Sequence, residues 1–405
     1  MSDQWIDTTW GDIATLHYGK SLKDYGQEPG LARVFGTNGP IGWHSVALVG
    51  EPGLIIGRKG AYRGVHYSTE PFWVIDTAYY LKPKVPLDLR WAYYALLDYD
   101  VNNIDDGSPI PSTTRDAFYF APVKLPPFEQ QQRIAAMLDA LDAKIEHNRQ
   151  MTATLEETAR ALFQSWFVDF DPVHAKAEGR DPALSADIAA LFPDRFGDDG
   201  LPEGWAMDKV GALFDIVAGN TPSTFNEAFW GAPHAWATPK DMSSLRSPIL
   251  DQTSRQLTGT GLGAASSGLV PAGSLLLSSR APIGYLAFAA IPLAINQGIA
   301  AFVKKEVSTV YAWAWCQAHM DVIKSGANGS TFQEISKGTL RQLPMLRPTR
   351  EATQRFDEIT SSHYKRILQI SCEIEALTQI RSLLLPKLIS GDLRIPSAAN
   401  EVAAA

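Results

Sequence analysis

Residues 128–167 read FEQQQRIAAMLDALDAKIEHNRQMTATLEETARALFQSWF, and one set of mostly apolar positions returns every third or fourth residue. Alternating steps of three and four over more than four heptads are typical of a helix that pairs with another helix through a coiled-coil seam. At 1.5 Å per residue such a helix is about 58 Å long, more than a globular domain requires. The expected seam positions are Ile134, Leu138, Leu141, Ile145, Asn148, Thr152, Leu155, Ala159, Leu162 and Trp166.

A second stretch, residues 350–390, repeats this pattern and predicts a second long helix. One extra residue near His363 and Ile367 is expected to unwind the supercoil locally. Two helices in a bundle core are the alternative, but long helices separated by a folded domain most simply pair antiparallel with each other. The expected seam positions are Phe356, Ile359, His363, Ile367, Ile370, Ile374, Leu377, Arg381, Leu384 and Leu388.

The chain also contains an internal repeat, which indicates two copies of one unit of about 200 residues. The offset between matching positions is 220 in the first part of the copies, where Leu54–Ile56 lies opposite Ser274–Leu276, and 222 farther on. Matching positions are Gly53 and Gly273, Gly64 and Gly284, Asp76-Thr77 and Asn296-Gln297, Gly107-Ser108 and Gly329-Ser330, Pro122 and Pro344, and Gln132-Arg133 and Gln354-Arg355.

Each copy begins with short apolar runs separated by glycine and proline, which predict strands and turns. Examples are Leu54–Ile56, Trp73–Ile75 and Leu275–Leu277. The expected fold class is therefore α+β: two β-rich mixed α/β domains in tandem repeat, joined by two long helices that form an antiparallel coiled coil. The acidic segment Asp171–Gly200 between the copies predicts a linker with a short helix at Ala183–Leu191.

Composition narrows the class of protein. With 405 residues, 45% of them apolar and 20% charged, the chain is an ordinary globular protein of two or three domains. A net charge of −8 argues against wholesale coating of a phosphate backbone. Two cysteines, no basic N-terminal region before an apolar run and no apolar stretch of about 20 residues favour a soluble, cytoplasmic protein.

Several motifs resemble catalytic ones, but each lacks a residue that the chemistry needs. Ala14–Ser21 fits a permissive phosphate-loop pattern but holds bulky side chains, and Gly19 with Gly219 reads instead as a shared structural turn. Gly259–Gly263 follows a polar segment, which is unlike an S-adenosylmethionine loop. Asp142-Ala143-Lys144 has a nuclease-like spacing but falls on the polar face of the predicted coiled coil. No catalytic residue and no metal site is predicted.

The polar turns of the β-rich copies carry side chains suited to nucleic acid, because Arg, Lys, Asn and Gln bond base edges and Ser or Thr bond bases or phosphates. Solvated loops without function are the alternative. A Gly-Ser loop stands at the same point of both copies with different neighbours, which suits reading two different sequences. The residues expected to face DNA are Arg58, Lys59, Tyr62, Arg63, Ser112, Thr113, Thr114 and Arg115 in the first copy, and Lys240, Arg280, Asn328, Ser330, Thr331 and Gln333 in the second.

Over essentially its whole length the chain resembles the specificity (S) subunits of type I restriction–modification systems. The resemblance rests on Leu125–Ala135 leading into the heptads, Leu162–Pro172 at the helix end, Leu201–Trp205 opening the second half and Leu384–Gly391 closing it. The second copy departs from the family at its helix opening, where Thr349–Gln354 replaces the Glu129-Gln130 signature.

The resemblance implies a DNA-recognition subunit that is not an enzyme, with two target recognition domains that each read half of a bipartite double-stranded site and two conserved helices that set the spacer. It implies two methyltransferase subunits that bind S-adenosylmethionine, and restriction subunits that use ATP and Mg, as partners. The alternatives are a stand-alone methyltransferase or nuclease, and a coiled-coil scaffold unrelated to DNA. The expected division is 1–127 first recognition domain, 128–170 first spacer helix, 171–202 linker, 203–347 second recognition domain, 348–391 second spacer helix and 392–405 tail.

Overall fold

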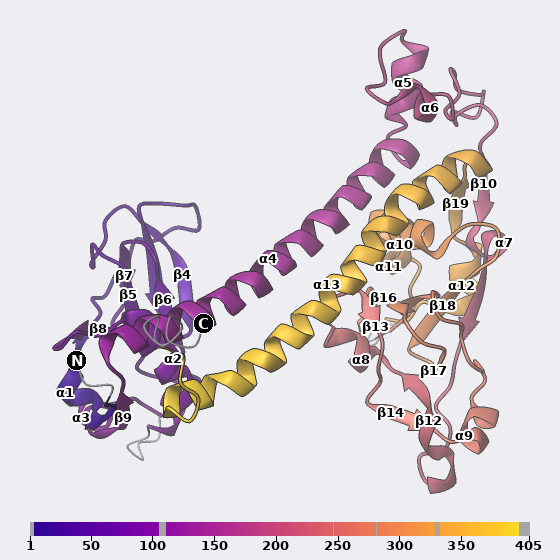
Figure 1. The fold of residues 1–405 in the computed structure, drawn as a ribbon. Helices are drawn as coiled ribbons and strands as arrows, with labels where there is room; N and C mark the ends of the chain where they lie inside the picture. Colours follow the sequence, from indigo (N-terminus) through magenta and orange to yellow (C-terminus); the bar gives the residue numbers. More distant parts are fainter. Residues whose placement is uncertain (1–3, 105–110, 246, 281, 329–332, 397–405) are drawn as a thin grey trace, which may run out of the picture. The chain divides into compact units, whose positions relative to one another are not determined.

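The computed structural model describes residues 4–104, 111–245, 247–280, 282–328 and 333–396. The chain divides into two compact units: residues 1–147 with 375–405 form unit 1, and residues 148–374 form unit 2. Helices α4 (Phe128–Phe167) and α13 (Arg350–Ser390) each contribute one half to each unit (Figure 1). Both long helices predicted from the sequence are confirmed, with the predicted ends.

The β-rich domain of unit 1 is built from two sheets and one small two-stranded ribbon. The four-stranded sheet has the antiparallel order β2-β8-β5-β6, and the three-stranded sheet β4-β3-β7 has β3 parallel to β7. Strand β1 pairs with β9 next to the start of α4. The strands are β1 (Ile6–Thr9), β2 (Ala14–Tyr18), β3 (Ala32–Gly36), β4 (Gly39–His44), β5 (Gly53–Gly57), β6 (Val65–Ser68), β7 (Phe72–Val74), β8 (Ala78–Pro83) and β9 (Pro122–Leu125), and the helices are α1 (Trp10–Ile13), α2 (Leu89–Tyr99), η1 (Val101–Asn103) and α3 (Arg115–Phe120).

Unit 2 repeats this plan with a larger main sheet of order β11-β18-β15-β16-β13, a three-stranded sheet β14-β12-β17 and the ribbon β10-β19. The strands are β10 (Ala206–Lys209), β11 (Phe214–Ala218), β12 (Trp230–Ala237), β13 (Ile249–Leu250), β14 (Arg255–Leu257), β15 (Leu275–Ser278), β16 (Leu286–Ala289), β17 (Leu293–Ile295), β18 (Ile299–Lys304) and β19 (Pro344–Arg347). The helices are α5 (Asp171–Ala177), α6 (Ala186–Ala189), α7 (Val210–Leu213), η2 (Glu227–Phe229), α8 (Pro239–Ser243), α9 (Gly259–Ala264), α10 (Thr309–Ala318), α11 (Met320–Ser325) and α12 (Lys337–Gln342).

The strand pairing corrects the repeat register by one residue. Ile55 of β5 pairs with Tyr80 of β8, and Leu276 of β15 pairs with Ala301 of β18. Because these pairs hold the same place in the two main sheets, the offset there is 221 rather than 220. The match between Gly53 and Gly273 concealed this shift. Gly53 lies in β5, whereas Gly273 lies in the turn before β15 at a φ of +82°, a backbone conformation that favours glycine.

Gly19 and Gly219 follow β2 and β11 and pack against the same neighbouring strand in each unit. A Cβ atom at Gly19 would lie 2.1 Å from the carbonyl oxygen of Ile75, and one at Gly219 would lie 1.7 Å from that of Ile295. Only glycine permits this close backbone approach, so the phosphate-loop resemblance around Gly19 reflects packing. The prediction of a shared structural role for the two glycines is confirmed.

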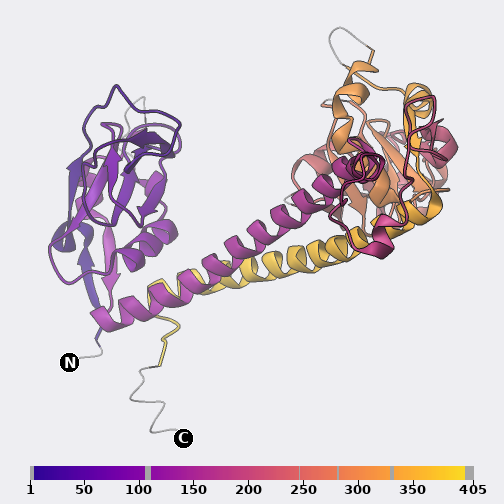
Figure 2. The same ribbon diagram turned by 90° about the horizontal axis from the view of Figure 1, so that it is seen from above.

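Within each unit the halves of α4 and α13 lie side by side and run in opposite directions (Figure 1 and Figure 2). In unit 2 the Phe356 ring on α13 lies 5.9 Å from that of Phe163 and 6.4 Å from that of Trp166 on α4. In unit 1 Ile134 and Leu138 of α4 share a buried cluster with Leu388 of α13. The predicted antiparallel pairing of the helices is therefore confirmed.

On α13 the buried positions differ from the predicted seam. Thr360 and Tyr364 are 0% and 8% exposed, whereas Ile359 and His363, which the heptads predicted, are only half-buried. The Tyr364 ring lies 5.0 Å from Phe288 and 5.2 Å from Trp313 of the β-rich domain. Because α13 packs on this domain as well as on α4, its buried face is wider than a two-helix seam.

The segment predicted as a linker is folded. It contains α5, which the sequence analysis did not predict, and α6, which is shorter than the predicted helix at 183–191. Val173 and Phe192 are 0% and 2% exposed and belong to the main core of unit 2, together with Trp205. The acidic, proline-containing composition therefore concealed a packed segment.

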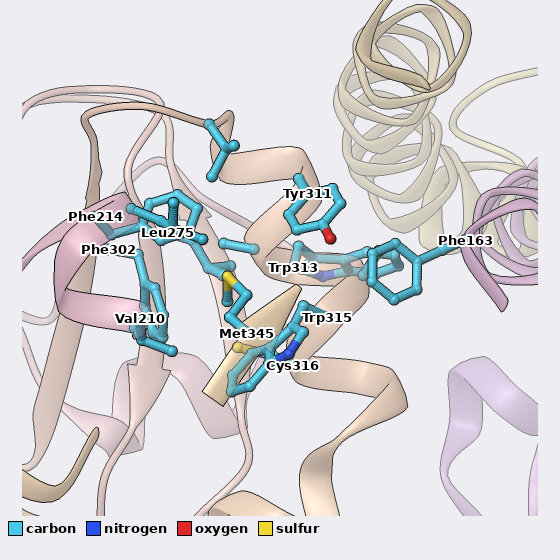
Figure 3. Packing of buried hydrophobic residues seen from close by; sticks show 14 of the residues in the cluster. Phe163, Val210, Phe214, Leu275, Phe302, Tyr311, Trp313, Trp315, Cys316 and Met345 are labelled. Carbon is cyan, nitrogen blue, oxygen red and sulfur yellow. The ribbon is translucent and has the colours of Figure 1, made fainter. Parts of the chain in front are cut away.

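The main core of unit 2 joins the sheet, α10 and the long helices (Figure 3). Phe163 of α4 packs 5.2 Å from the Tyr311 ring of α10, whose hydroxyl donates to the carbonyl oxygen of Leu346 at 3.0 Å. Burial raises the pKa of Tyr311 and of the Cys316 thiol, so both stay protonated. These aromatic contacts anchor α4 to the domain, because each buried aromatic side chain contributes a large apolar area.

Candidate nucleic-acid interface

Two predicted polar segments of unit 1 meet in the structure although about fifty residues separate them. Lys59 and Ser112 form an antiparallel β-bridge. Around it, the Gly60 amide donates to the Pro111 carbonyl at 3.0 Å and the Thr113 amide donates to the Arg58 carbonyl at 2.9 Å. The backbone thus presents the two segments as one surface beyond the end of β5, next to the start of α3.

Two arginines of this surface stack on one tyrosine. The guanidinium carbons of Arg58 and Arg115 lie 4.8 Å and 3.9 Å from the ring centroid of Tyr18, which is 46% exposed. Arg58 also donates from Nη1 to the carbonyl oxygen of Asp76 at 3.1 Å. Cation–π stacking on a fixed ring orients guanidinium groups before any ligand arrives.

The surroundings of Tyr18 are electropositive. Burial lowers the pKa of the neighbouring His17, and the charges of Lys82 and Arg115 lower it further. Burial, and then the adjacent Tyr18, raise the pKa of Tyr79 to about 12. Positive side chains interleaved with aromatic rings suit contact with phosphates and base edges. We refer to Tyr18, Arg58, Lys59, Ser112 and Arg115 as the arginine–tyrosine surface.

The structure places the remaining predicted residues of unit 1 in different surroundings. Tyr62 is 80% exposed. Thr114 caps α3, where its hydroxyl accepts from the Ala117 amide, which leaves it less free to bind a ligand. Arg63 and Thr113 are 3% and 0% exposed, and Arg63 donates from Nη2 to the carbonyl oxygen of Asn102 at 2.9 Å. Both side chains therefore lie inside the domain.

Unit 2 repeats the bridge with different side chains. Glu334 forms β-bridges with Arg280 and Asn328, and the Ile335 amide donates to the Ser279 carbonyl at 3.0 Å. The Arg280 guanidinium lies 3.7 Å from the Glu334 carboxylate, at 34% side-chain exposure. Where unit 1 has Ser112, unit 2 therefore has an acidic residue that neutralises part of the arginine's charge.

The other predicted residues of unit 2 are only partly described. Asn328 and Gln333 are exposed beside the bridge, while Ser330 and Thr331 lie outside the described residues. Lys240 is exposed on α8, which begins at the capping box formed by Thr238 and Asp241. The structure does not bring Lys240 into the bridge, and its segment forms a helix rather than the expected turn.

Sequence reasoning missed three residues with matching properties. Lys337 is the first residue of α12, directly after the N-cap Ser336. Arg115 has the same place in α3, after the N-cap Thr114, so the repeat offset of 222 was sufficient to predict Lys337 from Arg115. Arg255 stacks 3.4 Å from the ring centroid of Trp230. Tyr18 lies before any polar turn, and nothing in the sequence pattern indicated that two arginines would converge on it.

Asp142, considered for its nuclease-like spacing, lies in a structural network of unit 1. It accepts from Arg381 Nη1 at 2.8 Å and from the Tyr94 hydroxyl at 2.9 Å. Asp139, one turn earlier, is paired with Arg90 of α2. The prediction that Asp142 lies on the polar, solvated face of the coiled coil is therefore wrong, because α2 and α13 contact this face of α4. Among the described residues no group of three His, Cys, Asp or Glu side chains is placed to hold a metal ion.

The family model for the type I restriction modification DNA specificity domain matches residues 8–157 and 202–378, which are most of the chain. The chain belongs to this family. It is a DNA specificity subunit of a type I restriction–modification system, which is the non-catalytic part of such a system. The stand-alone methyltransferase and nuclease alternatives, and the scaffold unrelated to DNA, are accordingly dropped.

Curated relatives agree with this assignment. The specificity subunit of the HindI enzyme of Haemophilus influenzae is 29% identical over 329 residues, 70% of this chain and 71% of that protein. The MjaIX specificity subunit of Methanocaldococcus jannaschii is 32% identical over 164 residues, 40% of this chain and 38% of that protein. The S subunit structure from M. genitalium is similar in fold, with a TM-score of 0.65, 17% identity and 96% coverage of both chains.

Within the described residues, no helix of this specificity subunit combines the length and apolar character that a membrane span requires. Its two matched segments each contain one β-rich domain and the adjoining part of α4 or α13. The tandem layout predicted from the sequence is therefore confirmed.

Proposed function

We propose that each β-rich domain reads one half of a bipartite site in double-stranded DNA, with residues 1–127 and 203–347 as the two recognition domains. The observation that carries this proposal is the repeated backbone bridge. It joins Lys59 to Ser112 in one domain and Arg280 to Glu334 in the other. A constant backbone with different side chains is what two readers of different sequences require, because base identity is read by side chains.

In the first domain the arginine–tyrosine surface supplies the contacts. Arg58 and Arg115, oriented by Tyr18, are suited to bidentate bonds with guanine edges or phosphates, and Lys59 to phosphates. Tyr62 and Ser112 flank them. In the second domain Arg280, Asn328 and Gln333 supply the contacts, together with Lys337; Lys240, Ser330 and Thr331 stay part of the proposal as sequence-based expectations.

The long helices, residues 128–170 and 348–391, hold the two domains at a set distance and bind two methyltransferase subunits. Restriction subunits complete the assembly, which acts in the cytoplasm. S-adenosylmethionine, ATP and Mg belong to those partners. The net charge of −8 supports this arrangement, because an acidic chain needs basic partners to hold a DNA duplex.

Domain exchange tests the division of labour. Residues 1–127 are replaced by the matching domain of another specificity subunit, and the complex with the methyltransferase subunit selects its sites from random DNA. We expect a new sequence in one half-site and an unchanged sequence in the other. Exchange of residues 203–347 is the matched control and should change the opposite half. A change of both half-sites by either exchange contradicts the proposal.

A further inference from the structure

Unit 2 contains a pocket of about 560 Å³ that the DNA-binding proposal does not use. It lies between α4, α8, the start of β16 and the α10–α11 pair. Glu156 reaches it from α4, Met242 from α8, Tyr285 from the turn before β16, and Trp313, Gln317 and Met320 from α10 and α11.

Two polar groups at this pocket, Glu156 and Gln317 Oε1, lack partners among the described residues. The Gln317 Oε1 atom is buried and accepts no hydrogen bond in the described part of the chain. The Glu156 carboxylate makes no ion pair or hydrogen bond there either, and burial raises its pKa. Behind it, the Tyr364 hydroxyl is also buried without a partner. Acceptors left unsatisfied in a buried place carry a cost that a bound donor removes.

The apolar part of the lining suits a hydrocarbon stem that ends in a charge. Trp313 offers an aromatic surface, and the Met242 and Met320 thioethers adapt to irregular shapes. Arg160 also lines the pocket, but its side chain is 59% exposed and pairs with Glu157 at 3.6 Å, so its charge is directed to solvent and already balanced.

Carboxylates in the other half of α4 have positive partners within the chain. In unit 1 Asp139 pairs with Arg90 and Asp142 with Arg381. By the repeat offset of 222 these two positions correspond to Ser361 and Tyr364 of α13 in unit 2, not to Glu156. Glu156 has no such arginine partner among the described residues.

We propose that the pocket binds an organic cation, a guanidinium or primary ammonium group on a hydrocarbon stem, with the charge between Glu156 and Gln317 Oε1 and the stem along Trp313. The cation gives Glu156 the positive partner that Asp139 and Asp142 have within the chain. Its two possible sources are a free amine and a basic side chain of a partner subunit.

The probe is agmatine, which carries a guanidinium and an ammonium group on a four-carbon stem. The chain has seven methionines, so ¹³C-methyl methionine NMR of the full chain reports on Met242 and Met320 separately, with assignment by Met242→Leu and Met320→Leu. We expect saturable shifts confined to these two methyl groups. Glu156→Gln should weaken binding at least tenfold. Glu306→Gln, which removes the same charge from an exposed turn outside the pocket lining, should leave it unchanged.

A second arm identifies the source. Assembly with the methyltransferase subunit is measured for both variants, with and without agmatine. Weaker assembly for Glu156→Gln alone, and competition by agmatine, assign the cation to a side chain of the partner; unchanged assembly with agmatine binding retained assigns it to a free amine. Absence of methyl shifts at 20 mM agmatine overturns the proposal, as does equal binding by Glu156→Gln.

Discussion

Arg381 of α13 donates a hydrogen bond of 2.8 Å to Asp142 of α4, across 239 residues of sequence. The Tyr94 hydroxyl of α2 donates to the other carboxylate oxygen of Asp142 at 2.9 Å. One half-buried carboxylate therefore fastens both long helices to the β-rich domain within unit 1. Removing this carboxylate would leave Arg381 and Tyr94 without their acceptor.

We expect Asp142→Ala to lower the free energy of unfolding by about 1–3 kcal/mol, because Arg381 and Tyr94 both lose their acceptor. Urea denaturation at neutral pH measures the change. Glu157→Ala, which breaks an exposed pair on the same helix, is the control and should cost less than about 0.5 kcal/mol. Equal midpoints for the two variants would show that the Asp142 contacts add nothing to stability.

Asn148 is fully buried at a seam position, and neither its Oδ1 nor its Nδ2 atom has a hydrogen-bond partner in the described residues. We expect Asn148→Ile to stabilise the protein by about 1–3 kcal/mol, because the uncompensated amide is removed. A buried asparagine in a seam also specifies register, so the variant should select DNA sites with a broader range of spacer lengths. A destabilised variant would indicate that the amide is satisfied in solution.

In the arginine–tyrosine surface, Arg115→Ala should make the free energy of DNA binding less favourable by about 1–3 kcal/mol. It should also weaken the base preference at one position of one half-site. Tyr18→Leu should have a similar but smaller effect, because the arginines remain but lose the ring that orients them. Lys59→Ala should weaken binding to all DNA sequences alike. It should reduce the slope of the logarithm of the binding constant against the logarithm of the salt concentration by about 1.

Lys124→Ala on β9 is the control for all three variants. The measurement is selection of sites from random DNA by the complex with the methyltransferase subunit. Unchanged selectivity in the Arg115 and Tyr18 variants would remove this surface from the interface.

We expect His66 to make the stability of the first β-rich domain sensitive to mild acid. Burial lowers its pKa, and its Nε2 atom is buried without a hydrogen bond in the described residues. Below pH 6.5 the unfolded chain binds a proton that the folded chain excludes, so stability is lost as the pH falls from there towards the folded-state pKa. His66→Phe should preserve the packing of this side chain. The urea concentration at the unfolding midpoint should then decrease less between about pH 7.5 and pH 5.5 than it does in the unchanged protein. An identical loss in both proteins would assign the effect to other groups.

The spacer proposal predicts the result of shortening both helices together. Trp166 contacts Phe356, which places residues 149–155 opposite residues 367–373. Deleting both heptads keeps the seam in phase and shortens the helix pair by about 10.5 Å, close to three base pairs. The complex should lose its original site and select a shorter spacer, whereas a single deletion should destabilise the protein. An unchanged spacer in a folded double-deletion variant would refute the proposal.

The sequence was sufficient to predict the elements that rest on periodicity. The long helices follow from heptads that local spacing alone reveals, and the tandem layout follows from repeated glycines and prolines. The buried face of α13 was predicted less well, because Tyr364 packs on Phe288 and Trp313, which no helical pattern indicates. The register error at Gly273 has a similar origin, since a turn and a strand can both require glycine.

The candidate interface was predicted in part. The polar segments around Lys59 and Ser112 were identified, but their β-bridge was not, because contacts between distant residues depend on the whole sheet. Arg63 and Thr113 have the composition of binding residues and are nevertheless buried. Tyr18 escaped notice because its role comes from two arginines that reach it from other segments.

The folded segment 171–202 has a mechanical consequence. Val173 and Phe192 bury their side chains in the core that also holds Trp205, so the segment is not a flexible chain that can extend freely. Pulling it straight would expel these side chains and expose the aromatic cluster beneath them. The segment therefore cannot lengthen without partial unfolding of unit 2, which distinguishes it from a flexible linker.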